Sequence, residues 1–393
     1  MTGNEVIYLD HNASTSCDPH VVDAMLPHLA RAANPASLAH HPGRAATLAL
    51  EEARENVARF LGRRVRATEI TFTSGATEAN NLALLGAARA RADRGRRLVA
   101  QVTEHASVLE PLRALEAHGW EVVLVGVDGR GVVRLDQLET ALSHPGTTLL
   151  SLMLANNETG VVQPVAKACR LAAEHGVAVH CDAAQGPGKL RVDVDELGVD
   201  LLTLSGHKVY GPPGVGALYI RRSRPPLLLE PLLRGGGQER GLRPGSPNLP
   251  GAAGLAAALA LAADRLVDDS ERMARLRDRL EARLHDAIDG LTVNGATAPR
   301  LPNTSNLSFE GIDGNALLAS LPDVAVSTGS ACTSATPAPS GILRAMGVAP
   351  ELAAASLRIS IGRGTTDAEV DRAARRVAEE VMRLRAMGGS RRP

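Results

Sequence analysis

The sequence has few aromatic residues, which make up 2% of its 393 positions. Sequence-independent binding of single-stranded nucleic acid uses aromatic side chains as stacking platforms, so this composition argues against such a role. The 43 basic and 43 acidic residues cancel, which removes the electrostatic argument for direct nucleic-acid binding or for an anionic membrane surface as partner. No run approaches the roughly 20 apolar residues that a bilayer span requires.

Cysteine is also scarce, with four residues and no CxxC spacing. A structural zinc site is therefore not expected, and a chain of this length buries enough surface to fold without disulfides. The first ten residues carry acidic and strand-like residues instead of the basic and then apolar pattern of a signal segment. We therefore expect a cytoplasmic protein that forms two domains or one large α/β body.

Lysine is the scarcest charged residue, since only Lys167, Lys189 and Lys208 occur among the 43 basic residues. Chemistry that needs an amine therefore has three candidates. Lys208 ends the segment Ser205-Gly206-His207-Lys208, which follows an apolar stretch. A lysine at a strand end among small residues can be desolvated, which lowers its pKa and frees the amine for Schiff-base chemistry. In a chain this poor in lysine, we prefer that interpretation to a surface-loop lysine.

Between residues 69 and 220, short β-branched runs alternate with helical segments rich in Ala, Leu and Arg. This alternation predicts a mainly parallel sheet with helices on both faces. A Gly/Pro-rich loop joins the last two predicted strands, which also permits an antiparallel pair there. Seven strands are expected, at Glu69–Thr73, Leu98–Thr103, Glu121–Val127, Thr147–Leu154, Val177–Asp182, Asp200–Ser205 and Gly216–Ile220.

The remainder of the chain predicts a second region. A Gly/Pro-rich loop is expected at Pro225–Gly254, and one long helix at about Ala252–Asp289. That helix is too long for a single layer, so we expect it to lead into a smaller α+β domain. This domain ends in the amphipathic helix Asp367–Met387.

Polar residues gather at the ends of the predicted strands, where open α/β sheets bind ligands. Asp182 follows an apolar run, and a carboxylate there can keep a heteroaromatic ring nitrogen protonated; helix capping explains the residue equally well. One βα unit and a strand separate Asp182 from Lys208, so both side chains can reach one pocket. His105 could stack on a ring and Asn157 could donate to a ring oxygen, although for either alone capping or a turn is the default interpretation.

A small-residue turn, Thr73-Ser74-Gly75-Ala76-Thr77, precedes a predicted helix. Backbone N–H groups at such a helix start favour a phosphate. The pattern is equally that of an ordinary helix start capped by Ser74 or Thr77.

Two further residues suit substrate chemistry. Cys332 lies among small, polar neighbours, unlike Cys169 and Cys181, so exposure and reactivity are expected. Its ordinary pKa of about 8.5 would have to be lowered for a thiolate to form. Arg358 falls on the alternating segment Ser356-Leu357-Arg358-Ile359-Ser360, suited to a bidentate grip on a carboxylate; a surface ion pair is the default for a single arginine.

Taken in order along most of the chain, these motifs resemble the cysteine desulfurases of the NifS/IscS type, pyridoxal-phosphate enzymes of aminotransferase class V. The resemblance implies an α/β protein of fold type I: a large domain, residues 16–262, with a seven-stranded mainly parallel sheet, and a smaller α+β domain, residues 1–15 and 263–393, that carries the Cys332 loop. The motifs that carry it are Tyr8-Leu9-Asp10, Ser74–Asn81, Glu104-His105, Asn156–Gly160, Asp182–Gln185, Ser205–Lys208, Gly235–Arg240, Ser327–Ser334 and Arg358.

The resemblance also implies roles for single residues. Lys208 would bind the cofactor and move the substrate α-proton, and Asp182 would pair with the ring nitrogen. Gln185 and Asn157 would contact the ring oxygen, and His105 would stack over the ring and take part in catalysis. The cofactor phosphate would be held by four residues of one chain, Ala76, Thr77, Ser205 and His207, and by Ser246 of the neighbouring subunit in a homodimer. In most relatives a threonine replaces this serine.

For the substrate, L-cysteine, Arg358 and Asn157 would bind the carboxylate end and Cys332 would attack the sulfur. The products would be L-alanine and a persulfide on Cys332, which passes its sulfur to an acceptor protein. An iron–sulfur scaffold, tRNA thiolation and other sulfuration pathways stay open as destinations. No resident metal is expected, although Cys332 could contact an iron–sulfur cluster in transit. The alternatives are another pyridoxal-phosphate activity, such as aminotransferase or selenocysteine lyase, and a non-enzymatic scaffold.

Overall fold

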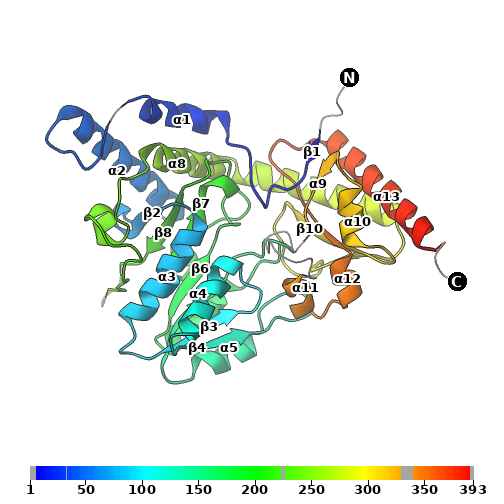
Figure 1. Cartoon of the computed structure of the whole chain (residues 1–393), viewed down its shortest axis with the longest axis horizontal. Coiled ribbons are helices and arrows are strands. Elements are labelled where there is room, and N and C mark those ends of the chain that lie inside the picture. The colour runs from blue at the N-terminus through cyan, green and yellow to red at the C-terminus, as the bar shows by residue number, and fades with distance from the viewer. Residues whose placement is uncertain (1–5, 32, 223–225, 329–339, 390–393) are drawn as a thin grey trace.

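The computed structural model describes residues 6–31, 33–222, 226–328 and 340–389. The larger of its two regions, on the left in Figure 1, is built on a seven-stranded sheet. The strand order is β2-β8-β7-β6-β5-β3-β4, and β8 is antiparallel to both of its neighbours while the other pairs are parallel. The predicted seven-stranded, mainly parallel sheet is confirmed. Its strands are β2 Ile70–Thr73, β3 Arg97–Gln101, β4 Glu121–Val125, β5 Thr147–Ser151, β6 Ala178–Asp182, β7 Leu201–Ser205 and β8 Gly216–Ile220.

Helices cover both faces of this sheet, because its inner strands are apolar on both sides. In β3, Leu98 and Ala100 pack into one core cluster with α3 and α4, whereas Val99 between them packs into the opposite cluster. Because successive side chains of a strand point to opposite faces, one strand contributes to both cores. The helices of this region are α1 Pro19–Leu29, α2 His41–Leu61, α3 Ala76–Ala90, α4 Ala106–Glu116, α5 Leu135–Leu142, α6 Val165–Glu174, α7 Val194–Leu197 and α8 Leu249–Asp264.

A second, smaller region has its own antiparallel sheet, in the order β12-β10-β9, and its own core. Ile7 of the N-terminal strand β1 and Leu9 directly after it contribute to this core, because β1 pairs in parallel with β11. Two separate cores support the predicted domain boundaries, which stay a prediction. The elements are β1 Ile7–Tyr8, α9 Leu266–Ala287, β9 Leu291–Val293, β10 Thr304–Phe309, α10 Gly314–Ala319, β11 Val324–Ala325, α11 Gly341–Ala345, α12 Pro350–Ala354, β12 Ser356–Ser360 and α13 Asp367–Gly389.

The single long helix predicted for Ala252–Asp289 is wrong, because the structure divides it into α8 and α9. The two axes differ by 74° and meet at Arg265. Each helix follows its own core: α8 buries Ala and Leu residues against the seven-stranded sheet, whereas α9 buries Met273, Leu276 and two further leucines in the smaller region. Among the described residues no single helix is long and apolar enough to cross a bilayer; α8 and α9 together meet that test, across their bend.

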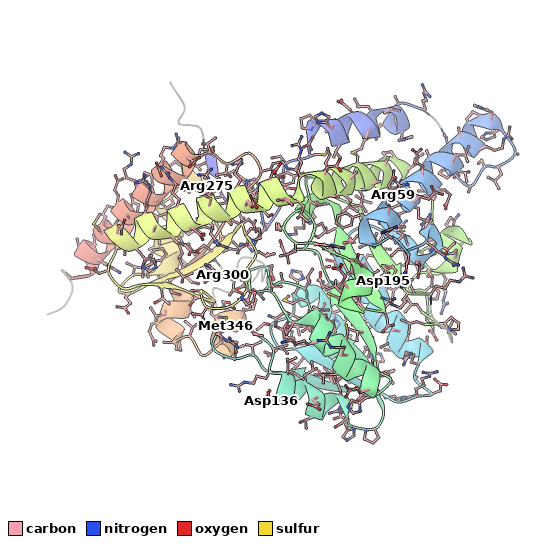
Figure 2. The ribbon with its side chains drawn as sticks, turned by 180° about the vertical axis from the view of Figure 1, so that it is seen from behind. Arg59, Asp136, Asp195, Arg275, Arg300 and Met346 are labelled. Atoms are coloured by element: carbon pink, nitrogen blue, oxygen red, sulfur yellow. The ribbon has the colours of Figure 1, made fainter. Side chains whose placement is uncertain are left out.

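Specific contacts join the two regions, and the boundary where Val161, Arg300 and Glu281 meet is called the seam below. Val161, beyond β5, forms an isolated antiparallel bridge with Arg300. The Arg300 guanidinium also donates to Glu281 of α9 at 2.8 Å. Figure 2 shows Arg300 between the two regions, with Arg275 farther out on α9. The chain segment after β5 is therefore fastened to the smaller region.

A buried ion pair fastens the loop that joins β8 to α8. Glu239 accepts from Arg54 of α2 through both carboxylate oxygens, at 2.6 and 2.8 Å, and from the backbone N–H of Phe72 at 3.0 Å. Glu239 and Arg240 both have positive φ, 47° and 58°, a conformation that side chains other than glycine adopt only when their surroundings hold it. The ion pair supplies that constraint, because it fixes the loop against β2.

We expect Arg54→Met to destabilise the protein by about 3–5 kcal/mol, because it leaves the Glu239 carboxylate buried without a counter-charge. The measurement is the guanidinium midpoint of unfolding followed by circular dichroism. Arg191→Met is the matched control, since Arg191 pairs with Glu196 at 2.8 Å on the exposed surface, and its midpoint should stay that of the wild type. Equal midpoints for all three proteins would contradict the structural role of the buried pair.

Candidate active site

A cavity of about 360 Å³ lies at the carboxyl ends of β2, β3, β6 and β7. This is the edge at which an open α/β sheet collects ligands. The cavity is lined by every predicted site residue except Ser246 and Cys332: Ala76, Thr77, His105, Asn157, Asp182, Gln185, Ser205, His207, Lys208 and Arg358. Ser246 is exposed on the β8–α8 loop, and Cys332 lies outside the described residues.

Lys208 enters the cavity from the short 3-10 helix that directly follows β7. Its amine donates to the backbone carbonyls of Asn12, at 2.6 Å, and Ala13, at 2.7 Å. Both carbonyls belong to the segment after β1, so the N-terminal chain crosses the seam to hold this lysine.

Asp182 ends β6 and is buried at the cavity wall. One carboxylate oxygen accepts from the Ala184 N–H at 2.9 Å, in a turn and not at a helix start, so the helix-capping alternative considered from sequence is wrong. The other oxygen accepts from the Asn80 amide at 2.7 Å. Asn80 also donates to Ser107 at 2.8 Å, and Ser107 contacts His105 Nδ1 at 2.8 Å. Asp182 is therefore joined to His105 through two polar residues to which sequence analysis assigned no role.

His105 caps α4 and also lines the cavity, and its stacking on a ring stays a prediction. Its Nδ1 accepts from the Ser107 N–H at 3.1 Å at the start of that helix. Burial lowers its pKa; the Asp182 charge opposes this shift, and the Lys208 charge adds a smaller lowering effect. The imidazole is therefore neutral at physiological pH, which suits stacking on a ring.

The N-terminus of α3 opens onto the cavity without a side-chain cap. Neither Ser74 nor Thr77 caps it, and the N-cap position is occupied by Gly75. The first N–H groups of a helix have no partner within it and favour an anion. His207 stands beside this cavity wall, and burial together with Lys208 lowers its pKa to about 4. The backbone N–H groups of Ala76 and Thr77 therefore suit an anion, and their contact with a cofactor phosphate stays a prediction.

Arg358 lies on β12 and lines the cavity from the smaller region. Its guanidinium donates to Asp10 at 2.6 Å and to the Asn157 carbonyl at 3.2 Å. Asp10 also accepts from the Ser327 hydroxyl at 2.6 Å, and Ser327 pairs with Arg358 through an isolated backbone bridge. The last described residues before the Cys332 segment therefore lie beside Arg358.

Sequence analysis missed Asn12, although this residue contacts more of the site than most predicted ones. Its carbonyl accepts from Lys208 and also from the Gln185 amide at 3.0 Å. Its side chain bonds to Thr304 and Asn303 of the smaller region. The only available signal was the run of small polar residues after Tyr8-Leu9-Asp10.

These residues fit pyridoxal 5'-phosphate. The cavity offers an amine for the cofactor aldehyde, a buried carboxylate for the ring nitrogen and an uncapped helix start for the phosphate, from Lys208, Asp182 and α3 respectively. The guanidinium of Arg358 on β12 also lines the cavity and suits a substrate carboxylate.

Comparisons with known proteins agree with this chemistry. Residues 7–373 match the family model of the class-V aminotransferases. A cysteine desulfurase IscS of Anaeromyxobacter sp. (strain Fw109-5) is 47% identical over 97% of this chain and 94% of its own length. The solved structure of a NifS-like protein superimposes with a TM-score of 0.89 at 37% identity, over 96% of this chain and all of the other.

A further solved structure bears on the substrate. It is described as SspA in complex with cysteine, and it matches 92% of this chain and all of its own with a TM-score of 0.79 and 34% identity. The chain therefore belongs to the class-V aminotransferase family and, within it, to the pyridoxal-phosphate-dependent cysteine desulfurases of the NifS/IscS type.

Proposed function

We propose that Lys208, Asp182 and Arg358 perform the desulfuration of L-cysteine in this one cavity, and that Cys332 accepts the sulfur. The observation that carries the proposal is that an amine after β7, a carboxylate at the end of β6 and a guanidinium within β12 line the same space. Bound pyridoxal phosphate withdraws electrons from the α-carbon of the substrate. Asp182 would keep the ring nitrogen protonated, and Lys208 would carry the proton that leaves the α-carbon.

Substrate orientation would depend on Arg358. The substrate carboxylate would take over the guanidinium face that Asp10 now contacts at 2.6 Å, with Asn157 beside it. Since Arg358 is 2% exposed, the ion pair would form away from solvent, where charge-assisted hydrogen bonds are strong. This grip would hold the α-carbon within reach of Lys208.

Cys332 would act as the nucleophile. Its thiolate would attack the substrate sulfur, so that a sulfur–sulfur bond forms while the carbon–sulfur bond breaks. The electron pair of the broken bond would stay with the carbon fragment, which would take up protons, including the one carried by Lys208, and leave as L-alanine. Cys332 follows Ser327 by five residues, a tether of at most about 18 Å. Ser327 lies beside Arg358, so this tether allows the thiol to reach the cavity.

The persulfide would pass to an acceptor protein, and we propose an iron–sulfur scaffold or a tRNA-thiolation protein as the acceptor class. Persulfide transfer requires reduced thiols, which the cytoplasm maintains, so a cytoplasmic location belongs to the proposal. We also retain the division into residues 16–262 and residues 1–15 with 263–393, which the two separate cores support.

A homodimer would complete the phosphate site. Ser246 is exposed and does not line the described wall of its own cavity, yet its loop is held in place by the Arg54–Glu239 pair. A rigid loop with an exposed hydroxyl suits donation to the cofactor phosphate of a second copy.

Replacement of Cys332 tests the proposed nucleophile. Wild-type protein given L-cysteine and a thiol reductant should release alanine and sulfide, and Cys332→Ala should release neither. Cys17→Ala is the control, because Cys17 is a free, half-buried cysteine outside the cavity, and it should behave as wild type. Alanine formation at the wild-type rate by Cys332→Ala would favour another pyridoxal-phosphate activity.

Replacement of Arg358 tests the carboxylate grip. Arg358→Lys should raise KM for L-cysteine by about 10- to 100-fold, because an ammonium group cannot reproduce the planar fork of a guanidinium. The visible absorbance of the bound cofactor should stay as in wild type. Arg113→Lys, on the exposed side of α4, should leave KM unchanged. An unaltered KM in Arg358→Lys would argue against the grip.

Mixed dimers test whether Ser246 acts across subunits. Ser246→Ala should lose the cofactor more readily on dilution, and Lys208→Ala should be inactive. A dimer of one chain of each variant contains one site in which both residues are intact, provided Ser246 acts on the neighbour. Cofactor retention at that site should return to the wild-type level; a mixed dimer no better than Ser246→Ala would place Ser246 in its own subunit.

A further inference from the structure

A second lysine lies beside the cavity, and the proposed mechanism does not use it. Lys189 sits in the turn after β6 and is 7% exposed. Its amine donates to Gln185 Oε1 at 2.9 Å. In a chain with three lysines, a buried one next to a cofactor-site residue calls for a physical explanation.

Lys189 is buried without a counter-charge. Within the described ranges, no carboxylate lies at ion-pairing distance from its amine, and the charged groups that face it are Lys208 and Arg358. His11 and His207 also lie within its electrostatic reach. Burial, together with the two cations, lowers the pKa of Lys189 to about 7. An unpaired buried amine is costly, and such groups are concentrated at functional sites.

The contacts of Gln185 show what the amine achieves. The Asn12 carbonyl, which accepts from Gln185 Nε2 at 3.0 Å, can only accept, and Lys189 in its ammonium form can only donate to Gln185 Oε1. These two partners allow one orientation of the amide. The second hydrogen on Nε2 is then left for the cavity that Gln185 lines.

We propose that Lys189 is a positioning residue that holds the Gln185 amide so that its NH2 group donates to the ring oxygen of bound pyridoxal phosphate. The inference rests on the proposed role of Gln185. A donor at the ring oxygen stabilises the negative charge that remains there when the bound cofactor loses a proton. Lys189 thereby lowers the pH at which that proton leaves.

The test is a pH titration of the visible absorbance of the purified holoenzyme, without substrate. In Lys189→Met, the midpoint should rise by about one pH unit, the size of shift that a lost polar partner produces. Lys167→Met is the matched control, because Lys167 is exposed on α6, and its midpoint should equal that of wild type. An unshifted midpoint in Lys189→Met would overturn the proposal.

A double-mutant cycle separates positioning from a direct effect of charge. Gln185→Ala should raise the midpoint by itself, and adding Lys189→Met should raise it no further. Additive shifts would overturn the positioning role. If the midpoint of Gln185→Ala equals that of wild type, Gln185 does not donate to the ring oxygen and this inference fails. Alanine release by the wild type tests the desulfurase function separately.

Lys189→Arg keeps the protein testable if Lys189→Met does not fold with cofactor bound. Arginine retains N–H donors for Gln185 Oε1, so its midpoint should stay within about 0.3 units of wild type while that of Gln185→Ala rises. A rise in Lys189→Arg as large as that in Gln185→Ala would contradict the proposal.

Discussion

The site depends on one backbone carbonyl, that of Asn12, which accepts from both Lys208 and Gln185. This carbonyl can serve the cavity because Asn12 is held from the other side by Asn303 and Thr304. The N-terminal strand pairs within the smaller region, so the segment after it must cross the seam. The amine of the site, carried by the seven-stranded sheet, is thus held by a chain segment that the smaller region anchors.

Electrostatics complement this geometry. Lys208 and Arg358 bring cationic groups to the cavity, and Lys189 lies beside it. Of the carboxylates nearby, Asp182 and Glu78 line the wall and Asp10 lies behind Arg358, but Glu78 is paired with Arg243 and Asp10 with Arg358. Such an arrangement favours anions, and the two that the reaction brings are a cofactor phosphate and a substrate carboxylate. The histidines of the cavity do not add to this charge, since burial lowers the pKa values of His105 and His207.

Much of the fold was predictable because its signals are local. The seven strands and the start of α13 follow from apolar periodicity, and their predicted positions agree with the structure to within a few residues. The break between α8 and α9 was not predictable, because neither proline nor glycine marks Arg265. That bend exists because two helices pack on two different cores, which is a property of the tertiary structure.

The amino-acid order alone indicates which chemical groups are present and where the strands carry them: Lys208 after β7, Asp182 at the end of β6 and Arg358 within an alternating strand. These positions can be read from the sequence, because the number of residues between a side chain and the end of its strand is fixed by the chain itself. Only the tertiary structure decided which groups meet. Asn12, Asn80 and Lys189 became part of the site because residues far apart in sequence share one small buried space, where every donor needs an acceptor.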